Sequence, residues 1–152
     1  MNSNLFSKRL WRLTPNKAAL LLGVFSFIGF LDALYLTVRH YQGLAVPCSV
    51  FEGCEIVTKS EYATILGVPL ALLGVVYYLG IFLLTVLYID QRKSNILELI
   101  ARIAILGFIA SLWFLYLQLF VIKALCIYCI ISGIMATFLF VVGRFVVYCK
   151  YE

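Results

Sequence analysis

The chain has 152 residues, of which 64% are hydrophobic and only 12% are charged, and its mean hydropathy is +1.06. A soluble domain carries about 25% charged residues, so this composition excludes an ordinary soluble protein. The net charge of +5 is explained by basic residues that flank apolar segments. We therefore infer no nucleic-acid partner.

Four apolar segments follow one another along the chain, at residues 18–38, 63–89, 99–122 and 124–148. Each is long enough to cross a bilayer as a helix, which takes about 20 apolar residues. In lipid the backbone must satisfy its own hydrogen bonds, so these segments are predicted to be helices. The sequence predicts a single domain over residues 1–152. Its predicted fold is an all-α integral membrane bundle of four transmembrane helices, with an extracytoplasmic loop over 40–62.

The basic residues predict the orientation of the bundle. Nine of the twelve fall on one side of the predicted spans: Lys8, Arg9, Arg12, Lys17, Arg92, Lys93, Arg102, Arg144 and Lys150. The positive-inside rule places this side, with both ends of the chain, in the cytoplasm. Loop 40–62 and the turn at 123–125 then face outward. No small-residue cleavage site follows the first segment, so we expect it to be a retained span and not a signal peptide.

Cys126 and Cys129 form a Cys-x-x-Cys motif where the fourth apolar segment begins. Residues three apart on a helix share a face, so the pair can form a disulfide with the helix intact. The positive end of the helix and the adjacent Lys123 favour a thiolate. Cys126 is expected to be accessible to attack from water, with Cys129 about one turn deeper.

Cys48 and Cys54 lie in the predicted outer loop, six residues apart. A disulfide between them needs a bent segment, and Pro47 and Gly53 supply a turn and flexibility. A mobile pair beside a pair fixed on a helix is typical of a dithiol relay that works by thiol–disulfide exchange. Two structural disulfides would use the same four cysteines. A four-thiolate zinc or iron–sulfur site is a further alternative, although the C-x5-C spacing exceeds the usual one.

Asp32 is the only acidic residue deep inside a predicted span, and an ionisable group there is a functional candidate by default. A role in relaying protons and a structural hydrogen bond to the third or fourth segment both fit it. Arg39 lies on the same helix face and could approach it. His40 is expected at an exposed loop edge, and Cys149 as an unpaired cytoplasmic thiol.

An aromatic stripe lies on the outer half of the third segment, at helical spacing. It includes Trp113, Tyr116 and Phe120. An apolar, aromatic surface with few polar groups suits a quinone ring and its tail. Aromatic residues are also expected at any membrane interface or in bundle packing, so both interpretations stay open.

Several stretches together resemble the vitamin K epoxide reductase family, in its bacterial form without the fused thioredoxin-like domain. They are DALYLT at 32–37, CSVFEGCEIVTKS at 48–60, GVPLALLG at 67–74 and the CIYC at 126–129. The resemblance implies that Cys48 faces an external thiol protein and that Cys54 exchanges with Cys126. It further implies that Cys129 reacts with the quinone and that Ser60 hydrogen-bonds a quinone oxygen. Ser60 can also be explained as a helix N-cap residue.

The activity implied by the resemblance is that of a membrane thiol–disulfide oxidoreductase that supports disulfide bond formation. Its cofactor would be a quinone of the ubiquinone, menaquinone or vitamin K type, and no metal is expected. Its partner would be a separate thioredoxin-fold, DsbA-like thiol protein. The expected place is a prokaryotic cytoplasmic membrane with the active site facing outward, or the endoplasmic reticulum in a eukaryote.

Two alternative functions stay open beside this one. The first is reduction of vitamin K quinone or its epoxide. The residues VPLAL at 68–72 and Gly133 stand where the animal enzymes carry polar epoxide-binding groups, which favours simple quinone reduction. The second is a non-catalytic four-span protein with structural disulfides.

Overall fold

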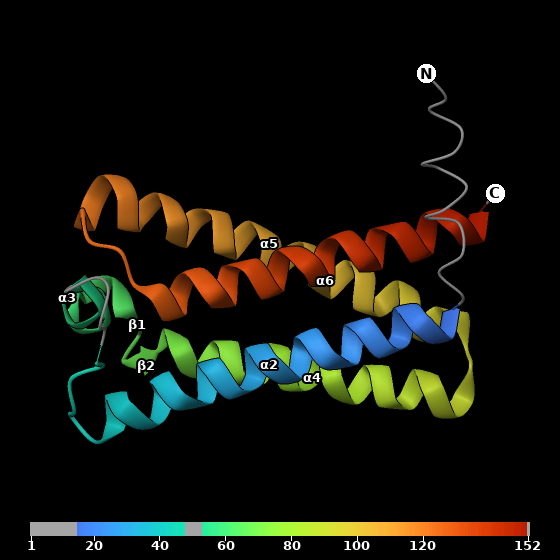
Figure 1. Ribbon diagram of the computed structural model, residues 1–152, viewed down its shortest axis with the longest axis horizontal. Coiled ribbons are helices and arrows are strands. Elements are labelled where there is room, and N and C mark those ends of the chain that lie inside the picture. Colours follow the sequence, from blue (N-terminus) through green and yellow to red (C-terminus); the bar gives the residue numbers. More distant parts are fainter. Residues whose placement is uncertain (1–14, 48–52, 152) are drawn as a thin grey trace.

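The computed structural model describes residues 15–47 and 53–151, and it contains four long helices within that part of the chain (Figure 1). They are α2 (Pro15–Tyr41), α4 (Leu70–Gln91), α5 (Ser94–Tyr116) and α6 (Ile127–Tyr151). A π-helical turn, η2 (Leu117–Ile122), continues α5. All four helices are long and apolar enough to cross a membrane. The predicted all-α membrane bundle of four helices is therefore confirmed.

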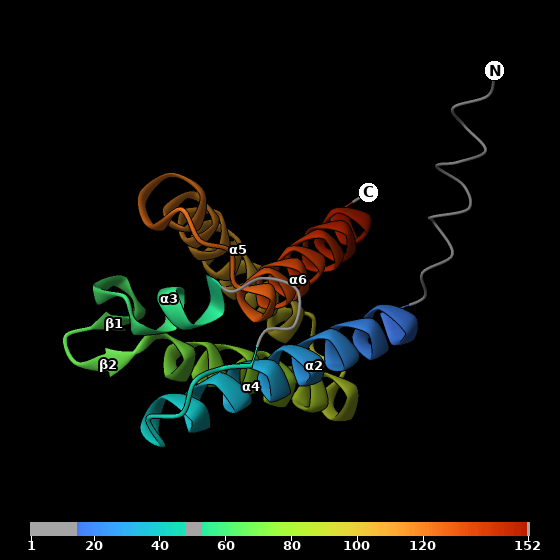
Figure 2. The ribbon, with the colours of Figure 1, turned by 60° about the vertical axis from the view of Figure 1, so that its left-hand side comes forward.

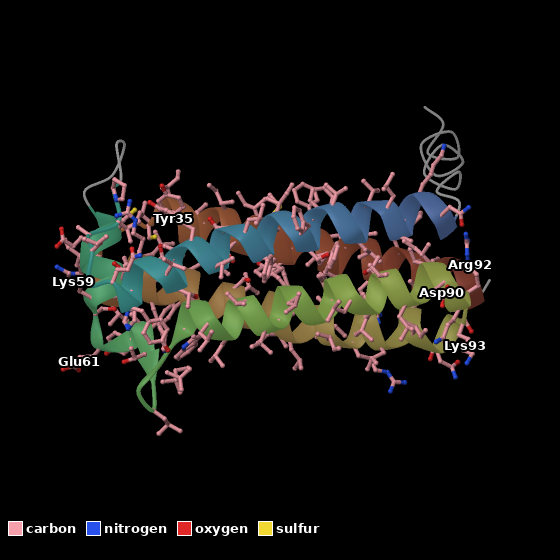
Figure 3. All side chains as sticks on the ribbon, turned by 90° about the horizontal axis from the view of Figure 1, so that it is seen from below. Tyr35, Lys59, Glu61, Asp90, Arg92 and Lys93 are labelled. Atoms are coloured by element: carbon pink, nitrogen blue, oxygen red, sulfur yellow. The ribbon has the colours of Figure 1, made fainter. Side chains whose placement is uncertain are left out.

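The helices pack through an apolar core and present apolar side chains outward. α2 contacts α4 and α6, and α5 contacts α6 and α4. Fully buried residues in the centre of the bundle include Leu22, Ile81, Ile100 and Leu139. Many large apolar side chains are exposed along the outer surfaces of the helices, which is typical of a surface that contacts lipid. Labelled charged residues lie at the two ends of the bundle (Figure 3).

One end of the bundle, which we call the loop end, carries the short elements (Figures 1 and 2). These are α3 (Gly53–Lys59), the 3-10 turn η1 (Glu61–Ala63) and the strands β1 (Thr64–Ile65) and β2 (Val68–Pro69). The connection from η2 to α6, residues 123–126, lies at the same end. The opposite end holds the α4–α5 turn with Arg92 and Lys93, together with the C-terminal end of α6 (Figures 1 and 3).

The second helix begins later than its predicted start at residue 63. Residues 64–69 form an antiparallel hairpin in which Thr64 pairs with Pro69 and Ile65 with Val68. Its two turn residues, Leu66 and Gly67, have φ values of 52° and 80°, as a type I′ hairpin turn requires. The prediction of a helix over 63–69 was wrong because an apolar run does not by itself distinguish a strand from a helix.

The fourth helix also begins later than predicted, at Ile127 instead of residue 124. Cys126 therefore precedes the helix, whereas Cys129 lies in its first turn. The carbonyl oxygen of Cys126 accepts a hydrogen bond from the backbone N–H of Ile130 at 3.0 Å. An accepting carbonyl just before the first helical residue makes Cys126 the N-cap residue of α6.

Tyr78 of α4 fastens this helix to α6 one turn beyond Cys129. Its ring packs directly over Gly29 of α2, where an added Cβ would lie 2.4 Å from a ring carbon. Its hydroxyl donates to the carbonyl oxygen of Ser132 at 2.6 Å and lies 3.0 Å from the Ser132 hydroxyl. This contact holds α2, α4 and α6 together below the Cys-x-x-Cys motif.

Replacing Tyr78 with phenylalanine is expected to lower the free energy of unfolding by about 1–2 kcal/mol, because a buried hydrogen bond is lost while the ring stays. Unfolding of the purified protein in detergent measures the loss. Tyr148→Phe is the matched control, since Tyr148 is exposed. Equal stability of the two variants would contradict a structural role for the Tyr78 hydroxyl.

Candidate functional site

The loop end brings together cysteines that lie far apart in the sequence. Cys54, on α3, is disulfide-bonded, whereas Cys126 and Cys129 are free thiols. Cys48 falls outside the described residues, and its pairing with Cys54 stays a prediction. Cys54 and Cys126 are both fully buried and belong to one packed cluster with Leu36, Val46 and Val57. Cys129 packs against the same cluster.

The backbone at Gly53 explains how α3 comes so close to the Cys-x-x-Cys motif. A Cβ atom built on Gly53 would lie 2.7 Å from the carbonyl oxygen of Leu125 and 2.8 Å from its nitrogen. Only a residue without a side chain allows this approach. The first turn of α3, including Cys54, therefore rests directly on the segment that leads into Cys126.

The two thiols of the motif differ in exposure, in the direction opposite to the prediction. Cys126 has no exposed surface, and Cys129 is partly exposed. The prediction that Cys126 is open to water was wrong because α3 and the preceding segment pack over it. Cys54 lies in a short helix and is buried, and the mobility expected of the loop pair stays a prediction. Cys126 is thus in contact with the cluster that contains Cys54 and is shielded from bulk solvent.

The position of Cys126 at the N-cap of α6 favours its thiolate. A hydrogen bond from the Cys129 thiol, together with hydrogen bonds from the backbone N–H groups of Cys129 and Tyr128, lowers the pKa of Cys126 to about 7 against the effect of burial. Unpaired N–H groups at the start of a helix stabilise a negative charge in this way. The N-cap position therefore makes the thiol of Cys126 more acidic than an ordinary cysteine.

Gln118 supports Cys126 from the preceding helix, and the sequence analysis missed it. Its side chain is almost fully buried, and its Oε1 atom accepts a hydrogen bond from the backbone N–H of Cys126 at 3.0 Å. Its backbone carbonyl accepts a second bond from the N–H of Ala124 at 3.1 Å. The signal that could have identified it is a polar amide inside an apolar segment. Polar side chains in membrane spans usually have a bonding partner or a function.

Tyrosines cover the cluster from the side of α2. Tyr128, between the two cysteines, packs against Tyr35 with a ring-centroid distance of 5.3 Å. The Nε atom of Arg39 donates to the Tyr35 hydroxyl at 3.2 Å, and its guanidinium lies over the same ring. Arg39 thus makes its described polar contact with Tyr35 and not with Asp32.

Asp32 lies close enough to Cys126 for its charge to raise the pKa of that thiol slightly. Its Oδ2 atom is buried and has no hydrogen-bond partner among the residues that the structure describes. The expected structural hydrogen bond to the third or fourth helix is therefore absent for this oxygen. A buried carboxylate oxygen without a partner suggests that a proton or a ligand completes its surroundings.

The residues predicted to hold a quinone lie in two places. The rings of Trp113, Tyr116 and Phe120 contact one another in sequence along α5 and η2, tilted by 30° at centroid distances of 5.9 and 5.2 Å, and are 49–66% exposed. Ser60 lines a pocket of about 330 Å³ at the loop end, together with Arg39 and His40. The Ser60 hydroxyl donates to the carbonyl oxygen of Val57 at 2.7 Å and makes no N-cap bond.

Whether each cysteine is free or disulfide-bonded bears on two alternatives for this site, a metal centre and a pair of structural disulfides. Within residues 15–47 and 53–151, no group of three or more His, Cys, Asp or Glu side chains is arranged to hold a metal ion. A disulfide sulfur is not a thiolate ligand, so the bonded Cys54 does not fit a four-thiolate centre. The free Cys126 and Cys129 do not fit a pair of permanent structural disulfides either.

A buried disulfide sulfur packed with a free Cys-x-x-Cys dithiol, at one end of a membrane bundle, is the arrangement of a membrane thiol–disulfide oxidoreductase. The comparison with known families agrees with this class. The model of the vitamin K epoxide reductase family matches residues 20–143. The chain belongs to this family.

A curated relative is the thiol-disulfide oxidoreductase LTO1 of Arabidopsis thaliana. It is 34% identical over 121 residues, which cover 72% of this chain and 31% of the plant protein. The chain therefore spans about a third of the length of that relative. The family and this relative together support a redox function in a multi-pass integral membrane protein.

Proposed function

We propose that the protein oxidises an extracytoplasmic thioredoxin-fold protein and passes the electrons through its two cysteine pairs to a membrane quinone. The observation that carries the proposal is the packing of Cys54 against the cluster of Cys126, with Gly53 in close contact with Leu125. Two sulfurs must approach within bonding distance to exchange, and this packing supports such an approach.

The proposed relay conserves electrons and protons at each exchange. Two thiols of the partner reduce the Cys48–Cys54 disulfide, and the partner forms its own disulfide. The Cys54 thiolate then attacks Cys126 in the Cys126–Cys129 disulfide, and Cys129 leaves as a thiolate that takes up a proton. Cys48 next attacks Cys54 and releases Cys126. The loop disulfide is thereby restored and the Cys-x-x-Cys pair is reduced, a state compatible with the bonded Cys54 and the free Cys126 and Cys129.

A membrane quinone is the final acceptor that we propose for the electrons of Cys129. A bound quinone accepts two electrons and two protons, the number that the two thiols release when they form a disulfide. Cys129 is partly exposed, and the adjoining rings of Trp113, Tyr116 and Phe120 offer aromatic faces on the surface of α5 and η2. The unpartnered Oδ2 atom of Asp32 adds a polar group that suits a proton-bearing ligand. We propose these aromatic residues as the groups that hold the quinone, whereas Ser60 lies in the separate pocket with Arg39 and His40 and its hydroxyl is bonded to Val57.

The position of the site at the membrane boundary follows from its two substrates. The thiol partner is soluble in water, and the quinone is soluble in lipid, so a relay between them must reach both phases. The loop end provides polar residues such as Lys59 and Glu61 next to apolar helix surfaces (Figure 3). The positive-inside rule favours an orientation in which the loop end faces away from the cytoplasm.

Quinone reduction by the purified protein tests the proposal directly. With a reduced thioredoxin-fold donor and a short-chain quinone, we expect steady formation of quinol, measured by absorbance. Cys129→Ser should reduce turnover to the uncatalysed rate because the disulfide can no longer form. Cys149→Ser, which changes a cysteine outside the proposed relay, is the matched control and should keep the parent rate. Full turnover by Cys129→Ser would refute the assignment of this sulfur.

A further inference from the structure

The connection between α5 and α6 places a buried amide against the backbone of a reactive cysteine. Gln118 lies in the π-helical turn η2, which is followed by its C-cap residue Lys123 with a left-handed φ of 54°. This turn reverses the chain, and the reversal puts the Gln118 side chain beside residue 126. Its Oε1 atom accepts the Cys126 N–H at a distance of 3.0 Å, in a buried position.

This hydrogen bond meets a need created by the N-cap position. The backbone N–H of an N-cap residue has no partner within its own helix. In a capping box a glutamate or glutamine three residues later accepts it, but the residue at that place in α6 is Cys129. Gln118 supplies the missing acceptor from another helix. The geometry of Cys126 therefore depends on a side chain eight residues earlier in the chain.

We propose that Gln118 is a positioning residue for exchange at Cys126, holding its backbone so that the sulfur lies on the first turn of α6 and faces α3. This inference rests on the proposed function and names a residue that supports it. Without the acceptor, the buried N–H of Cys126 would seek another partner and the cap would shift. The sulfur would then lose its N–H donors from Tyr128 and Cys129.

A change in ionisation separates this role from a general role in stability. The protein is prepared with Cys48, Cys54 and Cys149 replaced by serine, so that only the motif titrates as thiol. The groups that face Cys126 from the elements around it are unchanged between variants: Asp32 and Tyr35 of α2, and Tyr128 and Cys129 of α6. Thiolate absorbance is followed as the pH rises, since the thiolate forms above the pKa.

In the parent the first thiolate should form near pH 7, as the lowered pKa of Cys126 requires. Gln118→Leu should move this midpoint upward by about one pH unit, toward the value of an ordinary cysteine. Gln91→Leu is the matched control, because Gln91 is exposed at the end of α4, and its midpoint should stay at the parent value. An unchanged midpoint in Gln118→Leu would overturn the proposal.

A second measurement tests the position of the sulfur. In a background with Cys48→Ser and Cys129→Ser, diamide can join Cys54 to Cys126 by taking two electrons and two protons from their thiols. At alkaline pH, Gln118→Leu should slow this reaction, and Gln118→Glu should restore it because a carboxylate oxygen accepts the same N–H. A glutamate variant as slow as the leucine variant would also overturn the proposal. Failure of the parent to form the Cys54–Cys126 disulfide would instead refute the proposed relay.

Discussion

Gly53→Ala is expected to slow electron transfer between the two cysteine pairs roughly 5- to 150-fold, the range that corresponds to about 1–3 kcal/mol of overpacking. The added Cβ would lie 2.7 Å from the Leu125 carbonyl oxygen and 2.8 Å from its nitrogen. Both are backbone atoms, which do not move aside as a flexible side chain would. α3 must then withdraw, and Cys54 moves away from Cys126.

The transfer can be timed without quinone. Protein with an oxidised Cys-x-x-Cys pair is mixed with a reduced thioredoxin-fold donor, quenched with acid and alkylated, and the thiols at each pair are counted by mass spectrometry. Gly80→Ala is the matched control, since a Cβ there meets no atom within 4 Å. A parent-like transfer rate in Gly53→Ala would show that close packing of α3 is not needed for exchange.

Protein with Cys48→Ser and Cys129→Ser should accumulate a disulfide between Cys54 and Cys126 when treated with diamide. Each pair has lost the cysteine that would attack the mixed disulfide, so the Cys54–Cys126 bond is not broken by a second thiol of either pair. The two remaining sulfurs lie in one buried cluster. Oxidation should therefore convert most of the protein, as seen by non-reducing peptide mapping.

The paired control exchanges the retained cysteine of the motif. With Cys48→Ser and Cys126→Ser, the remaining sulfurs are Cys54 and Cys129, and we expect bond formation roughly tenfold slower, a barrier higher by about 1.4 kcal/mol. Cys129 lies within the helix and only borders the cluster. If Cys129 trapped Cys54 faster than Cys126 does, the order of exchange in the proposed relay would be reversed.

The spans were predictable from the sequence because hydropathy reports directly on the lipid phase. The four apolar runs gave the correct number of membrane helices within the described part of the chain. Their limits were less predictable at the loop end. Residues 64–69 are apolar enough for a helix, yet the positive φ values of Leu66 and Gly67 close a hairpin there. Hydropathy carries no information about such a turn.

The cysteines of the site were also predictable, whereas their surroundings were not. Spacing identified the Cys-x-x-Cys pair. The position of Cys126 at the outer end of the predicted span suggested that it would be the exposed sulfur. Its burial depends on α3, more than sixty residues away, folding over the start of α6. The contribution of Gln118 depends in the same way on the π-helical turn that reverses the chain. Such contacts between distant segments are set by packing and not by local pattern.

The enclosure of Cys126 restricts which thiols can react with it directly. A small thiol dissolved in water finds no surface on this sulfur, since its exposed fraction is zero. In the proposed relay, electrons reach Cys126 only by way of Cys54, which packs in the same buried cluster. Under that proposal, α3 would act as a cover that shields Cys126 from direct exchange with small thiols.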